Sequence, residues 1–171
     1  MKCVAIGGEP ATGKTTLMQI IYSKLTWVDF KMGLLRGHYN KEKNLALLGI
    51  YNIEGTFVGT DKLSMAVNNH FILFAKEQTK NILFEGDRLF TLNNINYLKD
   101  KYHTDVYILQ QSKEILHQRH LNRNDNQSEQ FLKGRKTKIN NIMNNVADIK
   151  FAQLFNINDS EKLANHILNS F

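Results

Sequence analysis

The pattern G-x-x-x-x-G-K-T occupies residues 8–15, directly after the apolar run CVAI. Its residues are Gly8, Glu9, Pro10, Ala11, Thr12, Gly13, Lys14 and Thr15, and Thr16 follows. The glycines let successive backbone N–H groups turn inward toward phosphate oxygens. Lys14 would bridge the β- and γ-phosphates, Thr15 would coordinate Mg²⁺, and Thr16 would reach a more internal phosphate. A predicted strand before the loop and a predicted helix after it argue against an accidental glycine-rich turn, so we expect a bound nucleoside triphosphate with magnesium.

A buried strand that ends in Glu-Gly-Asp-Arg forms a second cluster, at residues 82–88. Glu85 is placed to hold Mg²⁺, usually through water, as carboxylates do at the end of a strand that neighbours such a loop. We expect Asp87 and Arg88 to contact the second substrate, with a phosphate as another target for Arg88. The alternative is a surface turn whose charges are only solvated.

Two arginines four residues apart, Arg119 and Arg123, lie on one face of a predicted helix. There they would clamp the triphosphate and neutralise charge on the migrating phosphoryl group, although a solvated basic helix gives the same pattern. Residues 113–138 hold seven basic and three acidic side chains, so this segment carries 7 − 3 = +4 of the net charge of +6. Gly134 lies inside a predicted helix, where glycine costs about 1 kcal/mol relative to alanine. We therefore expect Arg119, Arg123 and Arg135 to sit on a segment that closes over the triphosphate.

The acceptor side must come from residues 31–80, where GLLRGHYN begins at Gly33. A loop that carries Arg36, His38 and Tyr39 can bind phosphate and stack on a base. These three residues are therefore predicted to bind the acceptor substrate.

Asp61 follows a glycine and a threonine and opens a predicted helix. It has two interpretations that remain open: an N-cap carboxylate with Ser64 at the third helical position, or the general base that takes the acceptor proton. His70 lies on an apolar helical stripe and is interpreted as a packed core residue.

The hydrophobic periodicity predicts the elements that must position these side chains. Strands are expected at 2–6, 45–51, 81–84, 104–109 and 149–155, and helices at 14–25, 63–79, 112–122, 128–146 and from 160 onward. Strands that alternate with helices predict a mostly parallel sheet covered on both faces. Ligands bind such sheets at the carboxyl ends of the strands, where the charged clusters fall.

The length of 171 residues and the 42% hydrophobic content predict one folded domain. No apolar run is long enough to cross a bilayer, and the N-terminus does not read as a signal peptide. The single cysteine, Cys3, reads as a buried strand residue and fits a reducing cytoplasm. The net charge of +6 suits an anionic partner. Abundant Asn, Lys and Ile hint at a phage or a low-GC bacterium, so the expected location is the cytoplasm, or the host cytoplasm if the source is a phage.

The order of these motifs resembles the nucleoside and nucleotide kinase group of P-loop proteins over nearly the whole chain. The resemblance implies a three-layer α/β P-loop NTPase/kinase fold with a five-stranded sheet in the order 2-3-1-4-5. It also implies ATP and Mg²⁺ as cofactors, a mobile helical lid at about 110–138, and a loop at 156–160 near the adenine base. The N-K-x-D, L-S-G-G-Q and E-R-S signatures of other classes are absent from the sequence.

The string GTDKLSMAV, with GHYN before it and EGDR after it, is similar to small phage-encoded P-loop kinases. These include the 5-hydroxymethyluracil DNA kinases, which implies transfer of the γ-phosphoryl group of ATP to the hydroxymethyl group of a base in DNA. A free nucleotide or nucleoside is the next candidate acceptor, and a sugar or other small metabolite the third. A P-loop NTPase that binds a partner without transferring phosphate is a further alternative. The preference for ATP over GTP and the oligomeric state stay open.

Overall fold

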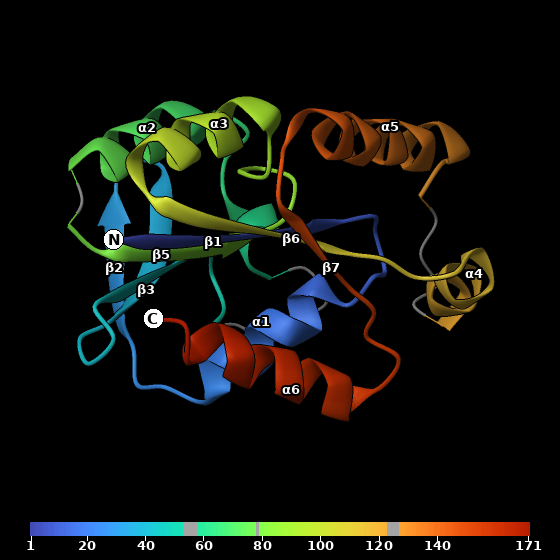
Figure 1. The fold of residues 1–171 in the computed structure, drawn as a ribbon, viewed down its shortest axis with the longest axis horizontal. Coiled ribbons are helices and arrows are strands. Elements are labelled where there is room, and N and C mark those ends of the chain that lie inside the picture. Colours follow the sequence, from blue (N-terminus) through green and yellow to red (C-terminus); the bar gives the residue numbers. More distant parts are fainter. Residues whose placement is uncertain (53–57, 78, 123–126) are drawn as a thin grey trace.

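The chain folds into a sheet with helices on both faces, as seen in a computed structural model that describes residues 1–52, 58–77, 79–122 and 127–171 (Figure 1). The strands are β1 (Lys2–Gly8), β2 (Val28–Met32), β3 (Leu35–Asn40), β4 (Leu45–Leu48), β5 (Asn81–Glu85), β6 (His103–Leu109) and β7 (Ile149–Ala152). The helices are α1 (Lys14–Ser23), α2 (Asn68–Glu77), α3 (Leu92–Lys101), α4 (Lys113–Asn122), α5 (Glu129–Asn145), α6 (Ile157–Leu168) and the short 3₁₀ helix η1 (Thr60–Lys62). Across the sheet the strands follow the order β2-β3-β4-β5-β1-β6-β7.

Five neighbouring strands of this sheet, β4, β5, β1, β6 and β7, pair in parallel. Counted among themselves in chain order, they give the order 2-3-1-4-5. The expected mostly parallel α/β sheet is therefore confirmed. The expected total of five strands is wrong, because the described part of the chain contributes seven.

The two additional strands, β2 and β3, form an antiparallel hairpin that pairs with the edge of β4. The pattern GLLRGHYN was expected to form an acceptor-binding loop that carries Arg36, His38 and Tyr39, whereas the structure places these residues in β3. Gly33 makes the turn, with a φ of 59°. Gly37 has a different reason: a side chain there would meet the Phe30 ring at 2.8 Å and the Leu47 carbonyl at 2.5 Å. Close packing, rather than a loop, explains this glycine.

Two expected elements are shorter than their apolar patterns. The strand expected at 45–51 ends at Leu48, because Gly49 turns the chain with a φ of 120°. The helix expected from residue 63 begins at Asn68, and η1 and turns precede it. The side chains of Leu63 and Val67 are still buried. The apolar spacing therefore predicted correctly which residues are buried, but not that they lie outside the helix.

Local capping explains two further differences. α6 begins at Ile157 rather than at 160, because Asn156 and Asp159 form a capping box in which each side chain accepts the other's backbone N–H. α3 was not expected, because its sequence LNNINYLKDK lacks a long apolar stripe. Thr91 caps it by accepting the N–H of Asn94.

The core lies in two layers, one on each face of the sheet. Helices α2, α3 and α5 cover one face, whereas α1 and α6 pack together on the other (Figure 1). Cys3 is fully buried in β1, and burial raises the pKa of its thiol well above the usual value. Its expected role as a buried strand residue is confirmed. Within the described residues, no helix has the length and apolar content that a bilayer crossing requires.

An ion cluster joins the sheet at the edge opposite the carboxyl ends of its parallel strands. The carboxylate of Asp105 in β6 lies 2.9 Å from the Lys2 ammonium and 2.7 Å from the Lys150 ammonium. Burial would raise the pKa of Asp105, but the hydrogen bonds from Lys150 and Lys2 outweigh it and hold the pKa below the usual value. The cluster thus ties β6 to β1 and β7.

We predict that Asp105→Asn lowers the free energy of unfolding by about 1.5–3 kcal/mol at neutral pH, because both lysines lose a charged partner. The depressed pKa means that this contribution is present above the ordinary pKa of 3.8 and is lost as the pH falls through the folded-state value. Urea unfolding at neutral and at strongly acidic pH measures the difference. The exposed Asp100→Asn serves as control, and an equal effect of both variants would contradict the prediction.

Candidate functional site

The glycine loop, residues 8–14, connects β1 to α1 at the carboxyl end of the parallel sheet. Gly8 and Gly13 have φ values of 143° and 100°, and Ala11 is also left-handed at 63°. A side chain on Gly8 would meet the Leu109 carbonyl at 2.5 Å, so only glycine fits against β6. Gly13 is the N-cap of α1 and offers no side-chain hydrogen bond to the helix. The positive end of α1 is therefore left open to an anion.

Lys14 lies across this loop instead of extending into solvent. Its ammonium donates to the carbonyls of Gly8 at 2.9 Å and Glu9 at 2.8 Å. The Thr12 hydroxyl also donates to the Glu9 carbonyl, at 2.8 Å. Lys14 is half-buried and braces the loop, so it has a structural role besides the phosphate contact that the sequence predicts. Its ammonium still lies against the glycine loop, which the sequence predicts to hold phosphate.

Glu85 ends β5, next to Ile6 of β1, and only 2% of its surface is exposed. Its Oε1 is fully buried and has no hydrogen-bond partner among the described residues. Desolvation raises the pKa of Glu85 to about 7, while the Lys14 charge counteracts the rise and the Asp61 and Asp87 charges add to it. A buried carboxylate without a full set of partners is costly, so the geometry suits a cation that is not a protein group.

Gly59 and Tyr51 close the wall behind this carboxylate. A side chain on Gly59 would lie 2.6 Å from Glu85 Oε1 and 2.8 Å from the Tyr51 hydroxyl oxygen. The Thr60 hydroxyl donates to the Glu85 carbonyl at 2.6 Å. The sequence analysis did not identify Tyr51 as part of this wall, and no local pattern marks it, because only tertiary packing brings it to β5.

Asp61 lies within η1, and α2 starts seven residues later at Asn68. It is therefore not the N-cap of an α-helix, and that interpretation is wrong. Its side chain is exposed overall. Desolvation raises the pKa of Asp61, with a further contribution from the Asp87 charge, against the opposing charges of Lys14, Arg88 and Arg135. Asp61 thus shares one electrostatic environment with the glycine loop and the end of β5.

Asp87, expected at the second substrate, faces α5 instead. Its carboxylate accepts from Arg135 at 2.5 Å, and the Lys138 ammonium donates to its backbone carbonyl at 2.8 Å. Asp87 therefore ties the end of β5 to α5 rather than presenting a free carboxylate. Arg88 remains half-buried beside it; its Nη1 donates to the Met65 sulfur, and its buried Nε has no partner among the described residues.

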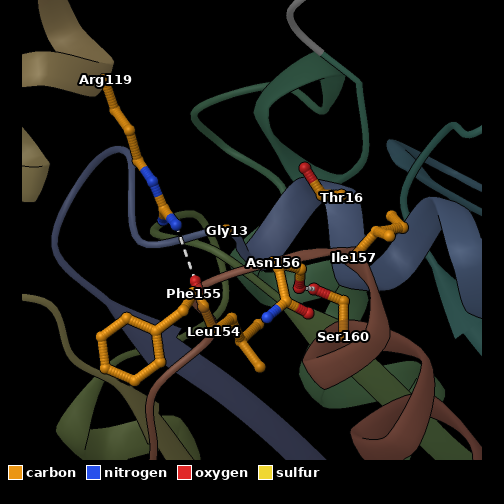
Figure 2. Close-up of a pocket in the computed structure, with 8 residues that line it drawn as sticks. All are labelled: Gly13, Thr16, Arg119, Leu154, Phe155, Asn156, Ile157 and Ser160. Atoms are coloured by element: carbon orange, nitrogen blue, oxygen red, sulfur yellow. Dashed lines mark hydrogen bonds between the residues drawn. The ribbon is translucent and has the colours of Figure 1, made fainter.

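Arg119 reaches from α4 across to the glycine loop. Its Nη1 donates to the Ala11 carbonyl at 3.0 Å and its Nη2 to the Leu154 carbonyl at 2.6 Å. Figure 2 shows the guanidinium beside a pocket of about 240 Å³ lined by Gly13, Thr16, Leu154, Phe155, Asn156, Ile157 and Ser160. The residues expected near an adenine base, 156–160, thus border the start of α1. Arg123 lies outside the described residues.

Of the three predicted acceptor-binding residues, Arg36 and His38 line one groove, whereas Tyr39 lines a different one. Arg36 is exposed near the carboxyl-end edge, where its carbonyl accepts from Gly49 at 2.9 Å. His38 is buried, and both ring nitrogens are engaged: Nδ1 with Asp29 at 2.6 Å, and Nε2 accepting from the Tyr51 N–H at 3.0 Å. Desolvation lowers the pKa of His38.

Tyr39 pairs with Ala46, toward the opposite edge of the sheet, and its hydroxyl donates to Asn44. The prediction that Arg36, His38 and Tyr39 act together on a substrate is therefore wrong for Tyr39, whereas Arg36 and His38 line one groove, with both ring nitrogens of His38 already engaged. Consecutive residues of a strand alternate between its faces, and a loop interpretation does not take this into account. His70, expected in the core, is half-buried and packs over Gly33.

The described residues contain no group of three or more His, Cys, Asp or Glu side chains arranged to hold a metal ion. Magnesium that arrives with a nucleotide needs fewer protein ligands, because phosphates and water supply most of its shell. The Thr15 hydroxyl at the start of α1 and the orphaned Glu85 carboxylate fit that smaller requirement.

Comparison of the chain with protein-family models and with curated proteins finds no match.

We predict that Glu85→Gln stabilises the ligand-free protein above about pH 7. Because the pKa of Glu85 is raised from 4.5 to about 7, the unfolded chain gives up this proton first, and the wild type loses stability as the pH rises between these values. Glutamine carries no charge to bury, so the variant should be more stable by roughly 1–3 kcal/mol. Urea unfolding across this pH range measures the gain, and the exposed Glu77→Gln is the control. A pH-independent difference would contradict the raised pKa.

Proposed function

We propose that this protein is an ATP-dependent phosphotransferase with a P-loop NTPase/kinase fold. The observation that carries the proposal is the convergence of three groups on the glycine loop. The Lys14 ammonium lies across the loop, the Glu85 carboxylate is buried at the neighbouring strand end with its Oε1 lacking a hydrogen-bond partner among the described residues, and the Arg119 guanidinium reaches over Ala11. A triphosphate with magnesium requires cationic groups at its phosphates, here Lys14 and Arg119, and a carboxylate near the metal ion, here Glu85.

The triphosphate would lie along residues 8–16, with its base directed to the pocket between Thr16 and Asn156. Lys14 would exchange its loop carbonyls for phosphate oxygens, and Thr15 and Glu85 would hold the cation. Magnesium supplies charge neutralisation between the phosphates. Arg119 would offset charge on the γ-phosphoryl group as it moves. Residues 110–138, which include α4 and the first part of α5 with Arg123 and Arg135, would act as the lid, while the last part of α5 stays packed on the core through Ile139 and Ile142.

Transfer to an acceptor, rather than hydrolysis alone, is supported by the groups beyond Glu85. Asp61 shares the electrostatic environment of Lys14 and Arg88, and its raised pKa suits a carboxylate that takes a proton. The acceptor hydroxyl would lose its proton to Asp61 as its oxygen forms a bond to the γ-phosphorus, and the bond between the γ-phosphorus and the β–γ bridging oxygen would break, so that ADP leaves with that electron pair. Arg88 would orient the acceptor. A P-loop NTPase that only binds a partner is the alternative outside the kinases.

The acceptor proposed is the hydroxymethyl group of 5-hydroxymethyluracil in DNA, a DNA-modifying reaction that fits a phage protein acting in the host cytoplasm. The net charge of +6 supports a polyanionic substrate, and a base inside a duplex would have to be flipped out to react. A free nucleotide or nucleoside is the alternative acceptor. Incubation with labelled ATP and separate pools of nucleosides, nucleoside monophosphates, plain DNA and hydroxymethylated DNA distinguishes these acceptors by which pool takes up label.

We predict that Lys14→Ala abolishes phosphoryl transfer, because no other side chain of the loop replaces its charge at the phosphates. The variant should also lose some stability, about 1 kcal/mol, since Lys14 braces the Gly8 and Glu9 carbonyls. Transfer rates and thermal unfolding are measured together, and Lys24→Ala at the far end of α1 is the matched control. A folded Lys14→Ala protein with near-normal transfer would overturn the kinase proposal.

We predict that Asp61→Asn loses most of the transfer rate, by about 10²–10⁴-fold, while its affinity for ATP changes little. Asparagine keeps the shape of the side chain but cannot take the acceptor proton. Single-turnover transfer and equilibrium ATP binding separate the two effects. If the variant turns over normally, Asp61 has no part in the proton transfer.

A further inference from the structure

The β2–β3 hairpin places two cations directly opposite each other. In its register Lys31 pairs with Arg36, and both side chains are exposed. Neither makes an ion pair or a side-chain hydrogen bond with the rest of the chain that the structure describes. Like charges at directly opposed positions destabilise a pair of strands. A lysine on the edge strand β2 also guards against unwanted strand pairing, but that role does not account for Arg36 on the internal strand β3.

Both cations line the same groove, of about 490 Å³, whose other walls include Gly49, Ile50 and Asn52. The groove also contains Asp29, whose two carboxylate oxygens are already committed. Oδ1 lies 2.6 Å from His38 Nδ1, and Oδ2 accepts from Asn52 Nδ2 at 2.7 Å. Asp29 therefore orders one end of the groove, and the charges of Lys31, Arg36 and Asp29 together leave 2 − 1 = +1 for an anionic ligand.

The groove lies back to back with the Glu85 end of β5. Ile50 and Gly59 exchange two backbone hydrogen bonds, of 3.0 Å and 2.7 Å. A side chain on Gly49 would meet the Gly59 carbonyl carbon at 2.6 Å, and one on Gly59 would meet Glu85 Oε1 at 2.6 Å. Only two glycine backbones therefore separate the groove from the carboxylate. The groove and the Glu85 end of β5 thus share the wall that Gly49 and Gly59 form.

We propose that this groove binds a phosphate group of the acceptor, gripped by Arg36 and Lys31. The inference rests on the proposed function, because it names the part of the acceptor that this second site recognises. Arg36 supplies a planar fork that matches two phosphate oxygens, and Lys31 supplies a point charge. The phosphate belongs either to a nucleic-acid backbone or to a free nucleotide. In both cases its charge relieves the repulsion between the opposed side chains.

Binding assays without ATP test the groove separately from catalysis. The probes are a short fluorescent single-stranded DNA that contains 5-hydroxymethyluracil, thymidine monophosphate and thymidine. The variants are Lys31→Gln and Arg36→Gln. Lys41→Gln removes the same charge from the β3–β4 turn, at the opposite edge of the sheet, and is the matched control.

We expect Lys31→Gln and Arg36→Gln each to weaken binding of a phosphate-bearing probe by about 3- to 10-fold and to reduce the salt slope for DNA by about one. Lys41→Gln should change the dissociation constant less than about twofold, and Arg36→Lys should recover part of the loss. Weak binding of thymidine, which has no phosphate, should be the same in every variant. Unfolding should show no loss of stability, since each change removes a repulsion.

The probe that responds identifies the source of the phosphate: loss on DNA alone indicates a backbone phosphate, and loss on thymidine monophosphate indicates a free nucleotide. The inference is overturned if both groove variants bind every probe as Lys41→Gln does, or if the wild type binds neither phosphate-bearing probe. A groove-dependent loss in a protein that transfers no label would defeat the proposed function and leave the anion site standing. If both groove variants bind normally in a protein that does transfer label, the anion site is overturned and the proposed function stands.

Discussion

Burial of the Glu85 carboxylate at the end of β5 is the constraint on which the rest of this site depends. The strand is central in a sheet covered on both faces, so its last residue cannot turn to water. The Lys14 charge offsets part of the cost, the Gly59 backbone lies against the carboxylate, and the Thr60 hydroxyl donates to the Glu85 backbone carbonyl. The glycines at 49, 59 and 86 all have positive φ values. They allow the chain to pass close to an unpaired carboxylate without placing a side chain on it.

Much of this arrangement could be predicted from the sequence, for reasons that are local. The glycine loop is fixed by residues 8–14, and its flanking strand and helix follow from apolar runs of ordinary length. The end of β5 is marked by a buried run that stops at a carboxylate. Both signals lie within a few neighbouring residues, and both place their residues at the carboxyl edge of the sheet.

The acceptor side could not be predicted in the same way, because its placement is set by pairing between strands. Reading residues 33–40 as a loop assigned His38 and Tyr39 to one surface, whereas the strand turns them to opposite faces. Asp87 was misassigned for a related reason: its partner Arg135 is far along the chain and meets it only through the packing of α5. Lys31, opposite Arg36, also stands out only once the register of the hairpin is known.

The ion pairs between Asp87 and α5 have a consequence in terms of thermodynamic linkage. The strand that carries Glu85 also holds, two residues later, the carboxylate that anchors Arg135 and Lys138. A change in charge at the end of β5 therefore alters the free energy of both the cation position and the helix anchor. If a cation binds at the end of β5 as proposed, any free energy by which it weakens the Asp87 anchor of α5 equals the free energy by which release of α5 favours its binding, because linkage is reciprocal. Such coupling would need no long pathway, because Glu85 and Asp87 are only two residues apart.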